Sequence, residues 1–128
     1  MNFDDLSKRL NNGEQWGFRT IPDSLDYLGW VLILKRTPPV VYPYHVSQSV
    51  EQYERLVKEA TELKVRPFQV MVRELNRAVH ESGEYESTED YRVRENHYFA
   101  TLEEVLSFFN SRQLKLEDIR SRFDIDAP

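Results

Sequence analysis

Cysteine is absent from the 128-residue chain, and its absence excludes several kinds of chemistry at once. Without a thiol, the chain has no disulfide bond, no thiolate nucleophile, no cysteine-ligated zinc and no iron–sulfur cluster. Glycine is also scarce, with only four residues, at positions 13, 17, 29 and 83. Phosphate-binding loops need glycines grouped before a helix, so neither a P-loop nor a dinucleotide-binding fingerprint is present.

Long hydrophobic runs and an excess of positive charge are missing as well. The longest apolar run, from Trp30 to Leu34, is far shorter than the roughly 20 residues that cross a membrane. The first residues lack the basic start and apolar core of a secretory signal, so we expect a cytoplasmic protein without membrane contact. The net charge of −5 repels phosphate backbones, so we expect no direct binding of nucleic acid.

The material that is present suffices for one folded domain over residues 1–128. Hydrophobic residues make up 40% and aromatic residues 12% of the chain, which is typical of a globular protein with a real core. Helical spacing of apolar residues predicts helices over 3–10, 49–63 and 101–109. The second and third begin with residues spaced as capping boxes. The second carries an apolar stripe of Val50, Tyr53, Val57, Ala60 and Leu63.

Alternation of apolar residues predicts strands over 15–21 and 90–99. Residues 30–36 are apolar on both faces, which predicts an inner strand covered on both sides and paired antiparallel with 15–21. The segment 67–82 favours a helix, although its first half also alternates as a strand would. A short last helix near 117–123 should turn Ile119 and Phe123 inward. These elements predict an α+β fold, with a small, mostly antiparallel sheet packed by four to five helices.

Motifs for catalysis or metal binding are weak. No serine lies in a nucleophile elbow. His80 and Glu81 begin a sequence close to the zinc motif H-E-x-x-H, but Glu84 replaces the second histidine. Gly83 should end the helix there, so we interpret His80 as a residue at a helix C-terminus and expect neither metal nor other cofactor.

Two further histidines, His45 and His97, each lie beside tyrosines. Because imidazole titrates near neutral pH, the two would form an acid–base pair if the fold brought them together. A small metal-free enzyme is therefore an alternative function. The other interpretation is that both are strand-end histidines packed on tyrosine rings.

The most unusual segment is Glu81–Asp90, which holds five carboxylates and no lysine or arginine. An acidic, tyrosine-containing turn is typical of a surface that attracts a basic protein. The alternative is a solvated loop neutralised by Arg92 and Arg94. A second candidate surface is a proline-rich edge strand. The predicted partner-binding residues are Glu84, Tyr85, Glu86, Glu89, Asp90 and Tyr91 in the first segment and Tyr42 and Tyr44 in the second.

Four stretches characterise the chain: the opening "FDDLSKRL", the tryptophan-bearing "QWGFRTI" and "GWVLILKR", and the acidic "GEYESTED". With its size and acidity, the chain resembles small bacterial immunity proteins encoded beside polymorphic or contact-dependent toxins. The resemblance implies a cognate partner, a basic toxin domain and often a nuclease, whose active or substrate-binding surface is occluded. A scaffold or subunit domain of a larger assembly is a third interpretation.

Overall fold

A computed structural model describes residues 1–37, 49–84 and 86–128. Five strands form one antiparallel sheet in the order β4-β3-β2-β1-β5. The strands are β1 (Trp16–Thr20), β2 (Tyr27–Lys35), β3 (Phe68–Asn76), β4 (Tyr91–Phe99) and β5 (Arg120–Ser121). Among the described residues the α-helices are α1 (Phe3–Asn11), α2 (Val50–Val65), α3 (Arg77–Ser82) and α4 (Leu102–Ser111). Short 3₁₀ turns lie at Thr88–Asp90 and Leu116–Asp118.

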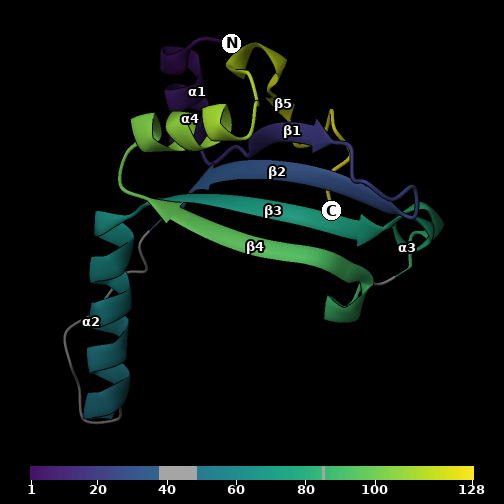
Figure 1. The fold of residues 1–128 in the computed structure, drawn as a ribbon. Coiled ribbons are helices and arrows are strands. Elements are labelled where there is room, and N and C mark those ends of the chain that lie inside the picture. The colour runs from purple at the N-terminus through teal and green to yellow at the C-terminus, as the bar shows by residue number, and fades with distance from the viewer. Residues whose placement is uncertain (38–48, 85) are drawn as a thin grey trace.

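The main core lies between one face of the sheet and the helices α1 and α4 (Figure 1). Each helix turns an apolar stripe toward the sheet, as the helical spacing predicts. The rings of Phe18 on β1 and Phe109 on α4 meet edge to face, with centroids 5.0 Å apart. The buried members of this core are Leu6, Leu10, Phe18, Val31, Ile33, Val70, Val72, Leu102, Val105, Phe109 and Ile119.

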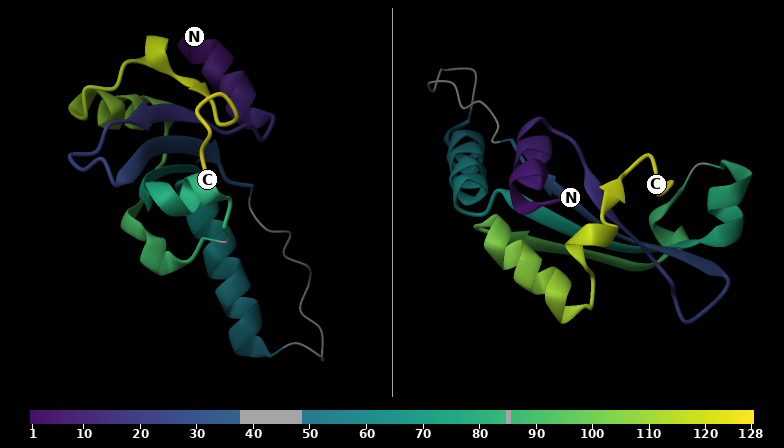
Figure 2. Two further views of the ribbon diagram at one scale, coloured as in Figure 1. Left: turned by 90° about the vertical axis from the view of Figure 1, so that its right-hand side faces the viewer. Right: turned by 90° about the horizontal axis from the view of Figure 1, so that it is seen from above.

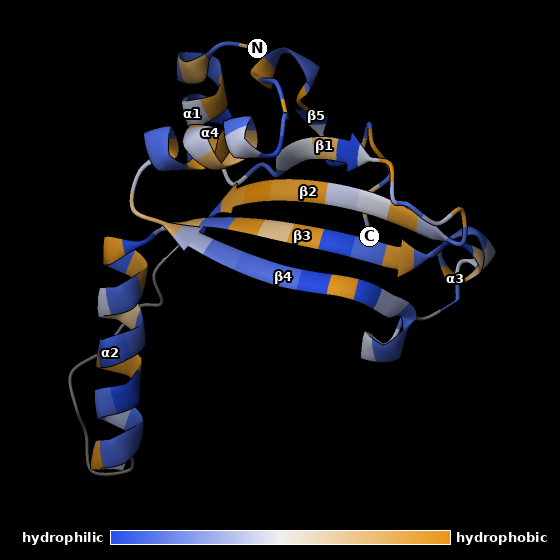
Figure 3. Ribbon diagram, in the orientation of Figure 1, coloured by the Kyte–Doolittle hydropathy of each residue, from blue (hydrophilic) through white to orange (hydrophobic). Residues whose placement is uncertain are grey.

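A smaller core covers part of the opposite face. Its centre is Trp30, which is fully buried and packs with its β2 neighbours Leu28 and Leu32. The C-terminal residues cross this face and add Ile125, whose carbonyl accepts a 2.8 Å hydrogen bond from the Trp30 indole N–H. β2 is therefore buried on both faces, as its continuous apolar run predicts. Figure 3 shows the contrast between this hydrophobic strand and the mostly hydrophilic β4.

The α+β class, the antiparallel sheet and the predicted strands at 15–21, 30–36 and 90–99 are confirmed. The helices near 3–10, 49–63 and 101–109 are confirmed too. Both arms of the capping box between Ser49 and Gln52 form. Thr101 accepts the predicted bond from the backbone N–H of Glu104, but the Glu104 carboxylate instead accepts the N–H of Ala100.

The predicted helix over 67–82 is wrong in its first half. Residues Phe68–Asn76 form β3, which pairs with β2 on one side and with β4 on the other. The alternating pattern prevails over the helical one, and it places Val70 and Val72 in the main core. Strands on both sides of β3 supply the backbone hydrogen bonds that a helix would otherwise provide. Only Arg77–Ser82 is helical, and this helix, α3, starts at an Asn76 cap.

The predicted last helix near 117–123 is also wrong. A 3₁₀ turn at Leu116–Asp118 precedes β5, whose residues pair with Trp16 and Gly17. Ile119 is buried as expected, but Phe123 is 89% exposed. The pairing of β5 with β1 satisfies the backbone there, so no helix is required. The estimate of four to five helices is accordingly slightly off.

The apolar stripe of α2 does not pack as predicted. Of the five stripe residues only Ala60 is buried, whereas Val50 and Val57 are exposed. Figure 1 and the left-hand view of Figure 2 show α2 extending away from the body of the sheet. Its C-terminal half borders a shallow hollow lined by Leu63, Arg66 and Tyr98.

Gly17 provides a test of the pairing between β1 and β2. A Cβ atom there would overlap the backbone carbonyl oxygen of Val31 and approach the Leu32 Cα to 2.9 Å. Since both obstacles are backbone atoms of a central strand, we expect Gly17→Ala to lower the free energy of unfolding by about 1–3 kcal/mol. Urea unfolding followed by tryptophan fluorescence measures the change. A midpoint equal to that of the wild type would contradict the described register.

Candidate functional site

The acidic segment Glu81–Asp90 connects α3 to β4, and it is ordered at both ends. Helix α3 begins where the Asn76 side chain accepts the N–H of Val79 and ends at Gly83, which adopts the left-handed conformation with φ +72°. At the other end, an Asp90 carboxylate oxygen accepts the backbone N–H of Ser87 at 2.8 Å and its hydroxyl at 3.1 Å. Local capping therefore holds the termini of the loop.

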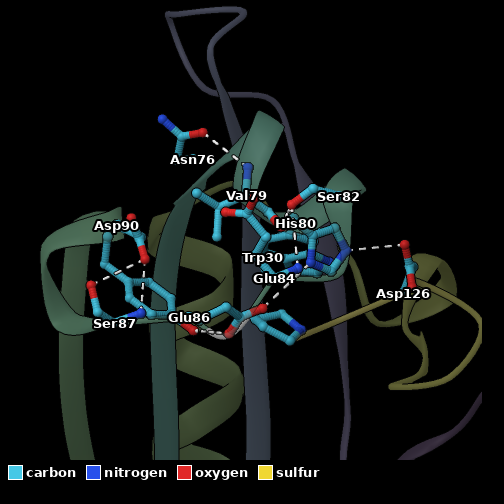
Figure 4. A network of polar contacts seen from close by, with 12 residues as sticks. Trp30, Asn76, Val79, His80, Ser82, Glu84, Glu86, Ser87, Asp90 and Asp126 are labelled. Atoms are coloured by element: carbon cyan, nitrogen blue, oxygen red, sulfur yellow. Dashed lines mark hydrogen bonds and ion pairs between the residues drawn. The ribbon is translucent and has the colours of Figure 1, made fainter.

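A polar network ties the same loop to the smaller core (Figure 4). Glu86 accepts a 2.9 Å hydrogen bond from the Tyr91 hydroxyl, and its other oxygen lies 3.7 Å from Nδ1 of His80. The second ring nitrogen of His80 lies 3.1 Å from the Asp126 carboxylate. The imidazole also packs edge-on against the Trp30 indole, with centroids 5.1 Å apart. Loop, α3 and C-terminal segment thus meet around one buried tryptophan.

Tyr91, the first residue of β4, contacts the acidic loop and has a raised pKa. Burial of its phenol, together with the hydrogen bond to Glu86 and the negative charge of that carboxylate, raises the Tyr91 pKa to about 12. A half-buried phenol that donates to a carboxylate is stabilised in its neutral form. The side chain is therefore a fixed internal support of the loop.

The predicted interface residues divide into two groups. Glu84 and Glu89 are exposed, and neither forms an ion pair within the described part of the chain. Glu86, Asp90 and Tyr91 are half-buried and make the internal contacts given above. The remaining predicted residues, Tyr42, Tyr44 and Tyr85, lie outside the described residues.

Arg92 and Arg94 do not neutralise the acidic loop. Arg92 binds Glu74 on β3 and lies 2.8 Å from Asp23 in the β1–β2 connection, and these hydrogen bonds raise its pKa. Arg94 donates to the Thr88 hydroxyl at 3.4 Å and forms no ion pair with a carboxylate of the described residues. Glu84 and Glu89 therefore have no cationic partner among the described residues, whereas Glu81 lies 3.4 Å from the Arg77 guanidinium.

The β1–β2 connection brings apolar side chains to the same end of the molecule. Ile21 is 94% exposed and Leu25 is 85% exposed. Arg77 at the start of α3 fixes this connection through two hydrogen bonds. Its backbone N–H donates to the backbone carbonyl of Asp26, and its Nε donates to the backbone carbonyl of Leu25 at 2.7 Å. We call this surface the acidic end: Ile21, Asp23, Leu25, Asp26, Glu81, Glu84 and Glu89.

Sequence reasoning missed the apolar part of the acidic end, because Ile21 is the last residue of the predicted strand over 15–21 and Leu25 lies in the polar connection that follows it. Leu25, a large aliphatic residue among turn-forming residues, was the available signal. The proximity of Leu25 to α3 depends on Arg77, which is 52 residues from Leu25 in the sequence. Such a long-range contact leaves no local pattern.

The histidine hypotheses have different outcomes. His80 lies near the C-terminus of α3, which ends at Ser82, so its interpretation as a helix-terminal residue is confirmed. His97 lies on β4, 3.4 Å from a Glu95 carboxylate oxygen, and its ring packs on Phe108 with centroids 4.8 Å apart. His45 lies outside the described residues, so the acid–base pair stays a hypothesis. Across residues 1–37, 49–84 and 86–128, no group of three potential ligands is placed to hold a metal ion.

Comparison with models of known protein families, with curated proteins and with solved structures found no match. In the described portion of the chain, no helix is both long enough and apolar enough to cross a membrane. The surface itself therefore provides the argument for function.

Tyr91 yields a prediction for the pH dependence of the folded protein. Its pKa of about 12 exceeds the ordinary 10.0, so the folded state binds this proton more tightly than the unfolded state does. The stabilisation is complete below pH 10 and is lost as the pH rises through 12. Phenolate absorbance after a rapid pH jump should show a tyrosine that ionises near 12. Tyr91→Phe should remove that ionisation step, and Glu86→Gln should lower the pKa of Tyr91. An unchanged titration in both variants would contradict the hydrogen bond between Tyr91 and Glu86.

Proposed function

We propose that this protein is a protein-binding module, specifically an immunity protein that neutralises a bacterial toxin by covering its active or substrate-binding surface. The observation that carries the proposal is the acidic end. There, Ile21 and Leu25 are almost fully exposed, and Asp26, Glu84 and Glu89 form no ion pair within the described residues. The resemblance in overall profile to small acidic immunity proteins supports the same function.

Apolar anchors within a polar rim are the usual anatomy of a protein interface. Burying one large aliphatic side chain contributes about 1.5–3 kcal/mol, so Ile21 and Leu25 would be the energetic centre. Both side chains lie on a connection fixed by Arg77 and Arg92. A surface that is already ordered loses little conformational entropy when it binds.

The charge of the acidic end defines the partner. Exposed carboxylates such as Glu84 and Glu89 would steer a basic surface into contact and accelerate association. A toxin that acts on nucleic acid needs a basic surface for the phosphate backbone. The acidic end would occupy that surface in place of the substrate, so binding would itself inhibit the toxin.

A growth-rescue assay tests this function. Each product of the genes that neighbour this one is expressed alone, and then together with the wild-type chain. We expect one product to arrest growth and the wild-type chain to restore it. Two variants should fail to restore growth: Glu84→Lys with Glu89→Lys, which reverses the charge, and Ile21→Ser with Leu25→Ser, which removes the apolar anchors.

The matched control is Glu54→Lys with Glu117→Lys, because both residues are exposed and the net charge changes by the same amount. This control should restore growth as well as the wild type does. Rescue by the Glu84 and Glu89 variant at wild-type level would contradict the acidic end as the interface. If the double variant His45→Ala with His97→Ala failed to restore growth while the Glu84 and Glu89 variant restored it, the result would favour the enzyme hypothesis.

A further inference from the structure

A second surface of opposite charge lies on the sheet face that carries Trp30. The strand register places Trp30 on β2 opposite Arg73 on β3, and Arg73 opposite Arg94 on β4. Asn96 and Tyr98 follow Arg94 at alternate positions of β4, on the same face of the sheet. The C-terminal segment contacts the Trp30 end of this face through Ile125. We call the part on β3 and β4 the arginine face: Arg73, Tyr91, Arg94, Asn96 and Tyr98.

Neither guanidinium at the centre of the arginine face is neutralised. Arg73 donates to the Glu95 backbone carbonyl at 2.6 Å and to the Asn96 side-chain oxygen at 2.7 Å. Arg94 lies over the Tyr91 ring, with the guanidinium carbon 5.9 Å from the centroid. In the described part of the chain no carboxylate lies within 4.0 Å of either residue.

Two like charges directly opposite each other on paired strands are unfavourable. Burial and the positive charge of Arg94 both lower the pKa of Arg73. In a chain with net charge −5, carboxylates are plentiful, yet none of those in the described residues forms an ion pair with Arg73 or Arg94. An uncompensated pair of planar guanidinium groups is the arrangement that binds an anion through paired hydrogen bonds.

Neighbouring side chains add donors and limit the length of the site. The Asn96 carbonyl oxygen accepts from both Arg73 and Gln69, so its amide N–H groups remain to donate to a ligand. Carboxylates bound the face at both ends: Glu86 lies at Tyr91, and Glu62 shares a shallow hollow with Tyr98. The cationic stretch is thus too short to follow a nucleic-acid backbone, whose binding requires many phosphate contacts.

β4 is the last strand of the sheet, and among the described strands it pairs only with β3. Figure 1 shows its outer edge running along the border of the sheet. An extended segment added to such an edge forms backbone hydrogen bonds with it. Every second side chain of the added strand would then lie on the same side as Arg94 and Arg73.

We propose that the β4 edge and the arginine face bind an extended acidic segment of a partner protein by strand addition. Carboxylates at alternate positions of that segment pair with Arg94 and Arg73, and Tyr98 contacts the side chain that follows. This site is distinct from the acidic end, and the proposal does not depend on the function assigned to that end.

The probe is a fluorescein-labelled peptide of about ten residues that alternates glutamate and threonine, because nine residues form β4. Fluorescence anisotropy measures its affinity, and amide chemical shifts locate its site. We expect saturable binding that weakens as salt rises, with the largest shifts in Tyr91–Phe99. A peptide with glutamine in place of glutamate should bind at least about tenfold more weakly.

Arg94→Gln should weaken binding of the acidic peptide about tenfold, and Arg94→Lys should restore only part of the affinity, since an ammonium lacks the planar fork. Arg55→Gln is the matched control, because Arg55 is an exposed residue on α2 and its loss changes the net charge equally. That control should bind as the wild type does. The urea midpoint of Arg94→Gln should equal or exceed that of the wild type, because the substitution relieves repulsion of Arg73.

Four results would overturn the proposal. The acidic peptide fails to bind at about 1 mM, the weakest affinity expected of such a site. The glutamine peptide binds equally well. Arg94→Gln leaves the affinity unchanged. Oligothymidylate of the same length binds more tightly than the peptide, which would assign the face to single-stranded nucleic acid.

Discussion

The structure depends on the burial of Trp30. Its indole fills the smaller core, donates to the Ile125 carbonyl and holds the C-terminal segment across the sheet. His80 packs on one side of the ring and the Arg19 guanidinium lies 4.9 Å from its centre. A single side chain thereby connects β2, α3, β1 and the C-terminal residues. His80 of α3 packs on this tryptophan and lies 3.7 Å from the Glu86 carboxylate, which links the acidic loop to the smaller core.

Tyr91 lies between two surfaces of opposite charge. Its hydroxyl supports Glu86 in the acidic loop, while its ring lies beneath the Arg94 guanidinium. Tyr91 therefore joins the acidic loop to the arginine face. A chain whose net charge alone indicates an acidic surface thus presents two chemically different surfaces.

Much of the fold could be predicted from local pattern. The caps at Asn2 and Ser49 and the left-handed Gly83 follow from short-range hydrogen bonding and backbone sterics. Phe68–Asn76 could not be assigned in the same way, because its pattern fits a helix and a strand. The acidic loop was identified from composition, but its partition into exposed and internal carboxylates depends on Tyr91 and Ser87, whose orientations only the fold sets.

The sequence by itself determined the helix starts, the doubly buried β2 and the concentration of carboxylates before β4, since each depends on residues within a few positions of one another. Only the tertiary structure decided that α2 extends from the body, that Phe123 is exposed and that Arg92 binds Glu74. It also decided that Leu25 lies beside the start of α3 and that Arg73 faces Arg94. These outcomes depend on strand pairing and on contacts between distant residues, and local periodicity does not encode either of them.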